Sequence, residues 1–180
     1  MEWPNVANAL ARFEPPFSRD ALEELRRRWD EWAPYLITEV EHLAGGGSPF
    51  LDEAEEELNA RYYFGCWLAA KMRDVRFYRP LVAASHCDSE RADLIFGDEL
   101  TDGLPWQLAS LCDGDESLLK ALAEEAAMWC RHAALKAMQI RVIEGDADAD
   151  ALVAFLERLC AREKEVMRRG AWNYEREPID

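Results

Sequence analysis

Two stretches of the chain, 58–72 and 127–143, are apolar on more than one side when placed on a helix, and this constrains the fold most. In 127–143, two stripes at helical spacing divide the apolar residues into Met128, Leu135, Met138 and Val142, and Trp129, Ala133, Ala137 and Ile140. A helix that is apolar on two sides has to be covered on two sides. Both stretches therefore predict helices that are sandwiched between neighbouring helices.

The rest of the chain predicts further, narrower helices. The first covers 18–33, where Ser18 is placed to cap it and Pro34 to end it, and a second follows with Leu36, Val40 and Leu43 in register. Further helical segments are expected near 76–85, 89–97, 103–112, 116–125 and 149–168. No segment alternates apolar and polar residues as a strand does. We therefore expect an all-α fold, with pairs of helices stacked as a short helical repeat.

The length of 180 residues suits one domain. Within it we expect an N-terminal helical segment over 1–50, packed on the stack, and a helical-repeat region over 51–168. The run Gly45-Gly46-Gly47-Ser48-Pro49 forms a flexible joint between them. Residues 169–180 are expected to be a loosely held tail.

Five stretches in the middle of the chain together resemble a known family. They are Tyr62–Ala70, Arg76–Val82, Phe96–Pro105, Cys112–Asp115 and His132–Ala137. The most specific are Gly-Asp-Glu-Leu-Thr-Asp over 97–102 and Cys-Asp-Gly-Asp over 112–115. In this order they resemble the bacterial DUF1186 family over roughly residues 55–160. The resemblance implies a HEAT-like α–α superhelix, and it carries over no activity and no catalytic residue.

The charge balance restricts the partners. The chain has 36 acidic and 21 basic residues, for a net charge of −15. Such a surface repels nucleic-acid phosphates and anionic lipid, whereas it attracts basic partners, so we expect no nucleic acid and no membrane. Five widely spaced cysteines, without a CxxC pair, favour free thiols, and neither a signal sequence nor a long apolar run is recognisable. We expect a soluble, cytoplasmic protein.

Three patterns resemble metal-binding or catalytic motifs, but each lacks a required part. Asp146, Asp148 and Asp150 start a calcium-loop pattern that has alanine where the sharp turn needs glycine, so helix caps are the main interpretation and calcium the alternative. Glu39-x-x-His42 occurs once, although a di-iron bundle needs two copies. Cys130 and His132, two residues apart, point away from each other on a helix. We therefore predict no catalytic residue, no metal ligand and no cofactor.

The acid-rich loops are the candidate functional residues. If successive turns of the stack emerge on one edge, their side chains form an acidic rim with a tryptophan as anchor, which would steer a basic partner. The alternative is ordinary turn and cap chemistry around a core tryptophan. The residues concerned are Asp98, Glu99, Asp102, Trp106, Asp113, Asp115 and Glu116.

Composition and motifs together favour a non-enzymatic, acidic protein-binding module. An adaptor, an inhibitor and an immunity-type protein that engages a basic partner fit this interpretation equally well. The alternatives are a carboxylate-based metal-binding protein or enzyme and a purely structural domain. The oligomeric state and the identity of the partner stay open at this point.

Overall fold

A computed structural model describes residues 19–44, 64–86, 103–112, 114–125 and 128–168, and every regular element within these ranges is helical. This confirms the all-α fold. In chain order the elements are α2 (Arg19–Arg27), α3 (Trp29–Ala44), a helical stretch over 64–72, the 3₁₀ turn η1 (Val75–Phe77), α5 (Tyr78–Ala84), α7 (Leu104–Leu111), α8 (Ser117–Glu125), α9 (Met128–Glu144) and α10 (Ala149–Arg168). No helix among them is long and apolar enough to cross a bilayer.

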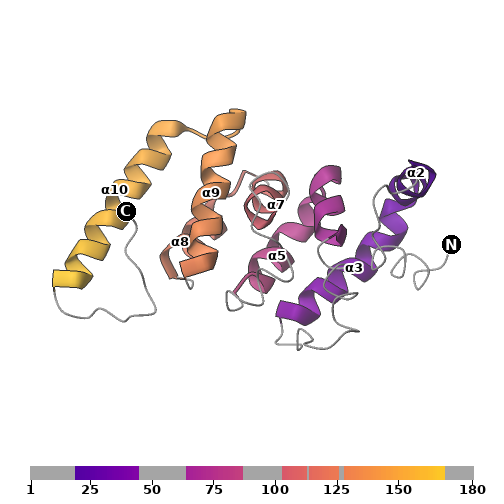
Figure 1. The fold of residues 1–180 in the computed structure, drawn as a ribbon, viewed down its shortest axis with the longest axis horizontal. Coiled ribbons are helices and arrows are strands. Elements are labelled where there is room, and N and C mark those ends of the chain that lie inside the picture. Colours follow the sequence, from indigo (N-terminus) through magenta and orange to yellow (C-terminus); the bar gives the residue numbers. More distant parts are fainter. Residues whose placement is uncertain (1–18, 45–63, 87–102, 113, 126–127, 169–180) are drawn as a thin grey trace.

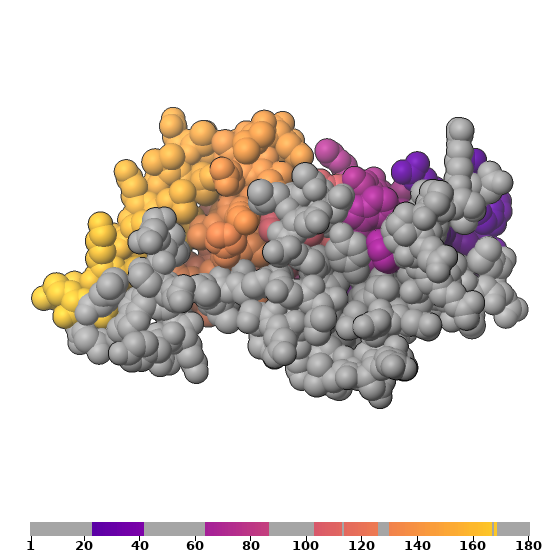
Figure 2. All heavy atoms as spheres, in the orientation of Figure 1, coloured from indigo at the N-terminus to yellow at the C-terminus, as the bar shows by residue number. Residues whose placement is uncertain are grey.

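The helices follow one another along the longest axis of the molecule (Figure 1). α2 and α3 lie at one end and α10 at the other, and the space-filling view shows the same order (Figure 2). α3 packs on α5, α5 on α7 and α8, α9 on both α7 and α8, and α10 on α9. Each helix therefore contacts elements close to it in the chain. Whether the units are true HEAT-like repeats stays a prediction.

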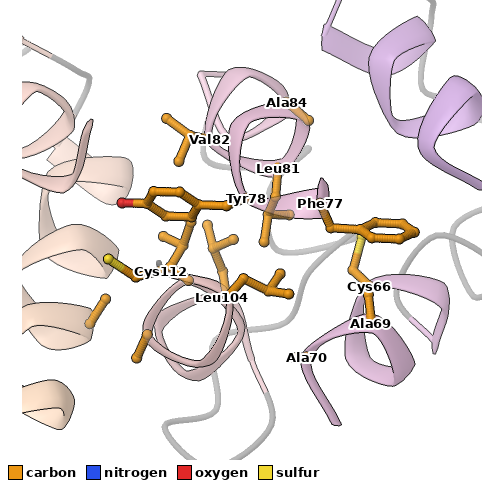
Figure 3. Packing of buried hydrophobic residues seen from close by; sticks show 14 of the residues in the cluster. Cys66, Ala69, Ala70, Phe77, Tyr78, Leu81, Val82, Ala84, Leu104 and Cys112 are labelled. Carbon is orange, nitrogen blue, oxygen red and sulfur yellow. The ribbon is translucent and has the colours of Figure 1, made fainter. Parts of the chain in front are cut away.

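One continuous hydrophobic cluster runs through the described helices, from Leu25 in α2 to Leu159 in α10. Its middle is organised by two consecutive aromatic residues, Phe77 and Tyr78, which lie at the η1–α5 junction and are both buried. Phe77 points toward Cys66 of the stretch 64–72, whereas Tyr78 points the other way, toward Cys112 at the end of α7 (Figure 3). Phe77 and Tyr78 thus connect the stretch 64–72 on one side of α5 with α7 on the other.

Pro34 does not end the first helix, contrary to the sequence prediction. α2 ends at Arg27, α3 begins at Trp29, and Pro34 lies inside α3. The break falls at Arg28, whose carbonyl accepts the Glu31 N–H at 3.0 Å, a tight three-residue step. Pro34 lies beyond the first turn of α3, where a proline removes the backbone hydrogen bond that its N–H would have donated to the Asp30 carbonyl, and α3 continues through it to Ala44.

Burial largely follows the predicted stripes. In α2 and α3 the side chains of Leu25, Trp29, Trp32, Leu36 and Val40 are buried, as their spacing predicted. The boundaries predicted for α10 agree with the structure, and those for α9 differ by one residue at each end. The predicted Ser18 cap, the helix over 89–97, the joint at 45–49 and the tail from 169 lie outside the described residues.

Small residues fill the most crowded side of α9. Cys130, Ala133, Ala134 and Ala137 are all buried, whereas the bulkier Leu135 is only partly buried. Small side chains let the backbones of α7 and α8 approach α9 closely, and α9 contacts both. α9 is therefore covered on more than one side, as its broad apolar surface predicted.

Candidate functional site

Four members of the predicted acidic rim, Asp98, Glu99, Asp102 and Asp113, lie outside the described residues. The structure therefore places three members, Trp106, Asp115 and Glu116. Each of these three makes contacts within the chain.

Asp115 and Glu116 stabilise the start of α8. The Asp115 carboxylate accepts the backbone N–H of Ser117 at 3.0 Å, and hydrogen bonds from the Ser117 side chain and backbone lower the pKa of Asp115. Glu116 Oε2 lies 3.2 Å from Lys120 Nζ, and its Oε1 lies 3.4 Å from Arg141 Nε. The charge of Glu116 is thus balanced by two cations, which leaves less of it to attract a partner.

Trp106 is partly buried against the hydrophobic core. Lys71 Nζ lies 4.3 Å from the centroid of its ring and 5.2 Å from that of Trp67. The ammonium group is therefore shared by two indole faces, an arrangement that favours the cation electrostatically. Trp106 therefore contacts Lys71 within the chain, so its ring is not simply available as an anchor for a binding partner.

Arg141 is a buried arginine that the sequence analysis missed. Its Nη1 donates to the Cys112 carbonyl at 3.1 Å and its Nη2 to the Asp146 carbonyl at 3.0 Å. Together with Glu116, these bonds join the end of α7, the start of α8 and the turn after α9. The planar guanidinium, with five donors, can serve several acceptors at once. Arg141 thereby fixes the turn that connects α9 to α10.

Arg131 makes a second buried contact of this kind. Its Nη2 lies 2.9 Å from Glu163 Oε1 of α10, and its Nε donates to the Ala123 carbonyl of α8 at 2.9 Å. The side chains of Arg131 and Glu163 are 3 % and 6 % exposed. A buried ion pair is costly to break, because one charge is then left without a partner. The pair ties α8, α9 and α10 together.

The turn between α9 and α10 is built by a glycine and an aspartate. Gly145 has φ +82°, its N–H bonds the Val142 carbonyl, and the Asp146 N–H bonds the Arg141 carbonyl at 2.8 Å. This is the hydrogen-bond pattern of a helix that ends in a left-handed residue. Asp148 then accepts the Ala151 N–H at 3.0 Å and caps α10, which confirms the cap interpretation for this residue.

The turn and the adjoining ends of α9 and α10 expose apolar and acidic side chains. Ile143 is 75 % exposed and Val153 is 54 % exposed. The exposed acids around them are Glu144, Asp146, Asp148 and Asp150. The stretch 142–157 contains no lysine, arginine or histidine. We call these six residues the α9–α10 corner; it lies where the two helices join at one edge of the molecule (Figure 1).

The other chemical patterns are not assembled into a site within the described part of the chain. No group of three or more His, Cys, Asp or Glu side chains there is placed to hold a metal ion. Cys130 is buried and its thiol faces the Ser85 carbonyl, whereas His132 is exposed. The His42 side chain lies outside the described residues.

A comparison with known protein families gives a match over nearly the whole chain. The model of a family described as "Protein of unknown function (DUF1186)" matches residues 1–173. The match includes the first 50 residues, which the resemblance seen in the sequence did not cover. No curated protein and no solved structure matches the chain.

Proposed function

The chain belongs to the DUF1186 family, and we propose that it is a non-catalytic binding module that engages a protein with a basic surface. Two features support this proposal: the net charge of −15 and the exposed α9–α10 corner.

The α9–α10 corner is the observation that carries the proposal. Exposed aliphatic side chains can be buried by a partner, and the surrounding acids select a partner of opposite charge. Arg141, the basic residue nearest to the corner on α9, is buried and donates to backbone carbonyls, so its charge does not face the surface. The corner is also held firmly, because Arg141 and the Asp148 cap fix its backbone. A rigid surface loses little entropy on binding.

The predicted acidic rim is a second surface that could contribute. Its described members are engaged within the chain, so the rim contribution rests on Asp98, Asp102 and their neighbours. We also propose that the module acts in the bacterial cytoplasm. The described cysteines, Cys66, Cys112, Cys130 and Cys160, are free thiols, which fits a reducing compartment.

The test is a capture experiment with three charge-matched variants. The immobilised chain is exposed to lysate from its native cells, captured proteins are identified by mass spectrometry, and the strongest is purified for affinity measurements. The corner variant is Glu144→Lys/Asp150→Lys, and the rim variant is Asp98→Lys/Asp102→Lys. Wild-type affinity should fall between about 50 and 300 mM NaCl, because salt screens exposed charges.

The control variant, Glu41→Lys/Glu125→Lys, changes the net charge by the same +4 on exposed acids outside the corner. We expect the corner variant to weaken binding at least about tenfold and the control to change it less than about twofold. Ile143→Ser should also weaken binding without lowering stability, because Ile143 is so exposed. Equal effects of the corner and control variants would contradict a specific surface, and a selective effect of the rim variant would move the site to the rim.

A further inference from the structure

Arginines gather in one hollow of this acidic chain, at the end opposite the α9–α10 corner. The hollow has a volume of about 490 Å³ and lies between α2, the start of α3 and the segment 72–76. Four arginines line it, Arg26, Arg27, Arg73 and Arg76, with Asp30 and Asp74 as the acidic residues. We call it the arginine pocket. Its volume falls in the range of pockets that hold small molecules.

One wall of the pocket is a fixed network. Trp29 Nε1 donates to Asp74 Oδ2 at 2.7 Å, and Arg76 Nη2 donates to the same oxygen at 2.6 Å. Arg76 Nη2 also donates to Asp30 Oδ1 at 3.1 Å. Burial would raise the pKa of Asp74, but the hydrogen bonds from Arg76 and Trp29 outweigh it and lower the pKa overall. Asp74 thus stays charged and holds Arg76 in place.

Two of the lining arginines, Arg26 and Arg73, are not paired with an acid among the described residues. Arg27 is paired with Glu24 at 2.7 Å and Arg76 with Asp74, whereas neither Arg26 nor Arg73 has an ion-pair partner among the described residues. Both are exposed. When Glu24 is counted with the lining residues, four arginines face three carboxylates, so the pocket has a net charge of +1 in a chain of −15.

Arg73 also has a backbone conformation that glycine normally supplies. Its φ is +51°, and it ends the helical stretch 64–72: the Arg73 N–H bonds the Ala70 carbonyl and the Asp74 N–H bonds the Ala69 carbonyl, both at 3.0 Å. Gly145 occupies the equivalent position after α9, with the same bonds. A left-handed non-glycine residue costs free energy and tends to occur at functional sites. Because arginine is strained in this conformation, we take its presence at this turn as a sign of function.

We propose that the arginine pocket binds a small organic phosphate. Arg26 and Arg73 contact the phosphoryl oxygens, and Arg76, held in place by Asp74, adds positive charge beside them. The flat guanidinium fork matches the geometry of phosphate oxygens and forms two hydrogen bonds at once. Met72 and Val75 also line the pocket, and Val75 is 44 % exposed. They offer an apolar contact for the organic part of the ligand. The limited volume of the pocket favours a small molecule over an acidic peptide.

The experiment measures the affinity of the full chain for three probes by isothermal titration calorimetry at constant ionic strength. The probes are inorganic phosphate, phenyl phosphate and a hexaglutamate peptide. We expect phenyl phosphate to bind at least about fivefold more tightly than inorganic phosphate, because its ring can contact Val75. Val75→Ala should reduce that difference. A larger affinity for hexaglutamate than for phenyl phosphate would overturn the assignment to a small molecule.

Two variants test the arginines, and a third controls for net charge. Arg73→Gly should weaken phosphate binding about tenfold or more, since a hydrogen bond to a charged group is lost, while it should not lower the melting temperature because glycine suits φ +51°. Arg26→Gln should weaken binding similarly. Arg158→Gln removes the same charge from exposed α10, at the far end of the molecule, and should leave affinity unchanged. Equal affinity of all four proteins, or no phosphate binding by wild type, would overturn the proposal.

Discussion

Gly65→Ala tests a close contact between the stretch 64–72 and α3. A Cβ atom on Gly65 would lie 2.6 Å from both Leu36 Cδ1 and Leu36 Cδ2 and 3.1 Å from Leu36 Cγ. Carbon atoms in good contact are about 3.5–4.0 Å apart, so Leu36 would have to move by ~1 Å. Leu36 is 1 % exposed and belongs to the core cluster, and therefore has little room to move.

Two effects of opposite sign determine how much Gly65→Ala changes the free energy of unfolding. Overpacking a core costs ~1–3 kcal/mol, whereas alanine is better than glycine inside a helix by ~1 kcal/mol. We expect Gly65→Ala to lower the free energy of unfolding by ~1 kcal/mol in the wild-type background. In a Leu36→Ala background the clash is gone, so the same change should raise it by ~1 kcal/mol. The coupling between the two positions is then ~2 kcal/mol.

Urea unfolding followed by far-ultraviolet circular dichroism measures all four proteins of the cycle. A control cycle combines Gly65→Ala with Leu119→Ala, a fully buried leucine of α8, and should be additive within ~0.5 kcal/mol. If Gly65→Ala has the same sign in both Leu36 backgrounds, the close approach of the stretch 64–72 to α3 is wrong.

Three further predictions follow from other contacts. Glu163→Gln should lower the free energy of unfolding by ~3 kcal/mol, because Arg131 stays buried without a counter-charge; Glu157→Gln, on exposed α10 surface, should change it by less than ~0.5 kcal/mol in the same urea assay. Gly145→Ala should cost ~1–2 kcal/mol, since alanine is strained at φ +82°, and an unchanged urea midpoint would contradict the left-handed cap. The pKa of Asp74 is lowered by folding, so its stabilisation is present above the ordinary value near 3.8 and is lost as pH falls through the lower folded value. Wild type and Asp74→Asn should therefore differ in stability near neutral pH and converge at acid pH, which thermal unfolding between about pH 7 and pH 3 measures.

Periodicity in the sequence predicted the described helices and the buried faces of α2 and α3 well, whereas it did not predict the core residues of α5, α7 and α8. The spacing of Leu36 and Val40 places them on one face of a helix, and both side chains are buried. The start of α10 was predictable because Asp148 caps it by a local bond, three residues from its partner. Local patterns are visible in a sequence, so features that depend on them can be predicted.

Features that depend on distant partners could not be predicted. Glu116 was interpreted as part of an acidic rim, but its counter-ion Arg141 is 25 residues away in the chain. The burial of Arg141 was not predicted for the same reason. Its position between Ile140 and Val142 in an apolar helix could have indicated it. Pro34 was taken as a helix end because proline usually breaks a helix interior, but the break falls at Arg28 and α3 continues through Pro34.

The distribution of arginines separates the two proposed surfaces. Arg131 and Arg141 are buried and hold helices together, so their charges contribute little to the α9–α10 corner. Arg26 and Arg73, which have no ion-pair partner in the described part of the chain, lie at the other end. The described helices lie between these two ends (Figure 1). A small phosphate in the arginine pocket should therefore not compete with a basic partner at the corner. Saturating phenyl phosphate that displaced the partner at constant ionic strength would show that the two surfaces are coupled through the stack or that one of them is misplaced.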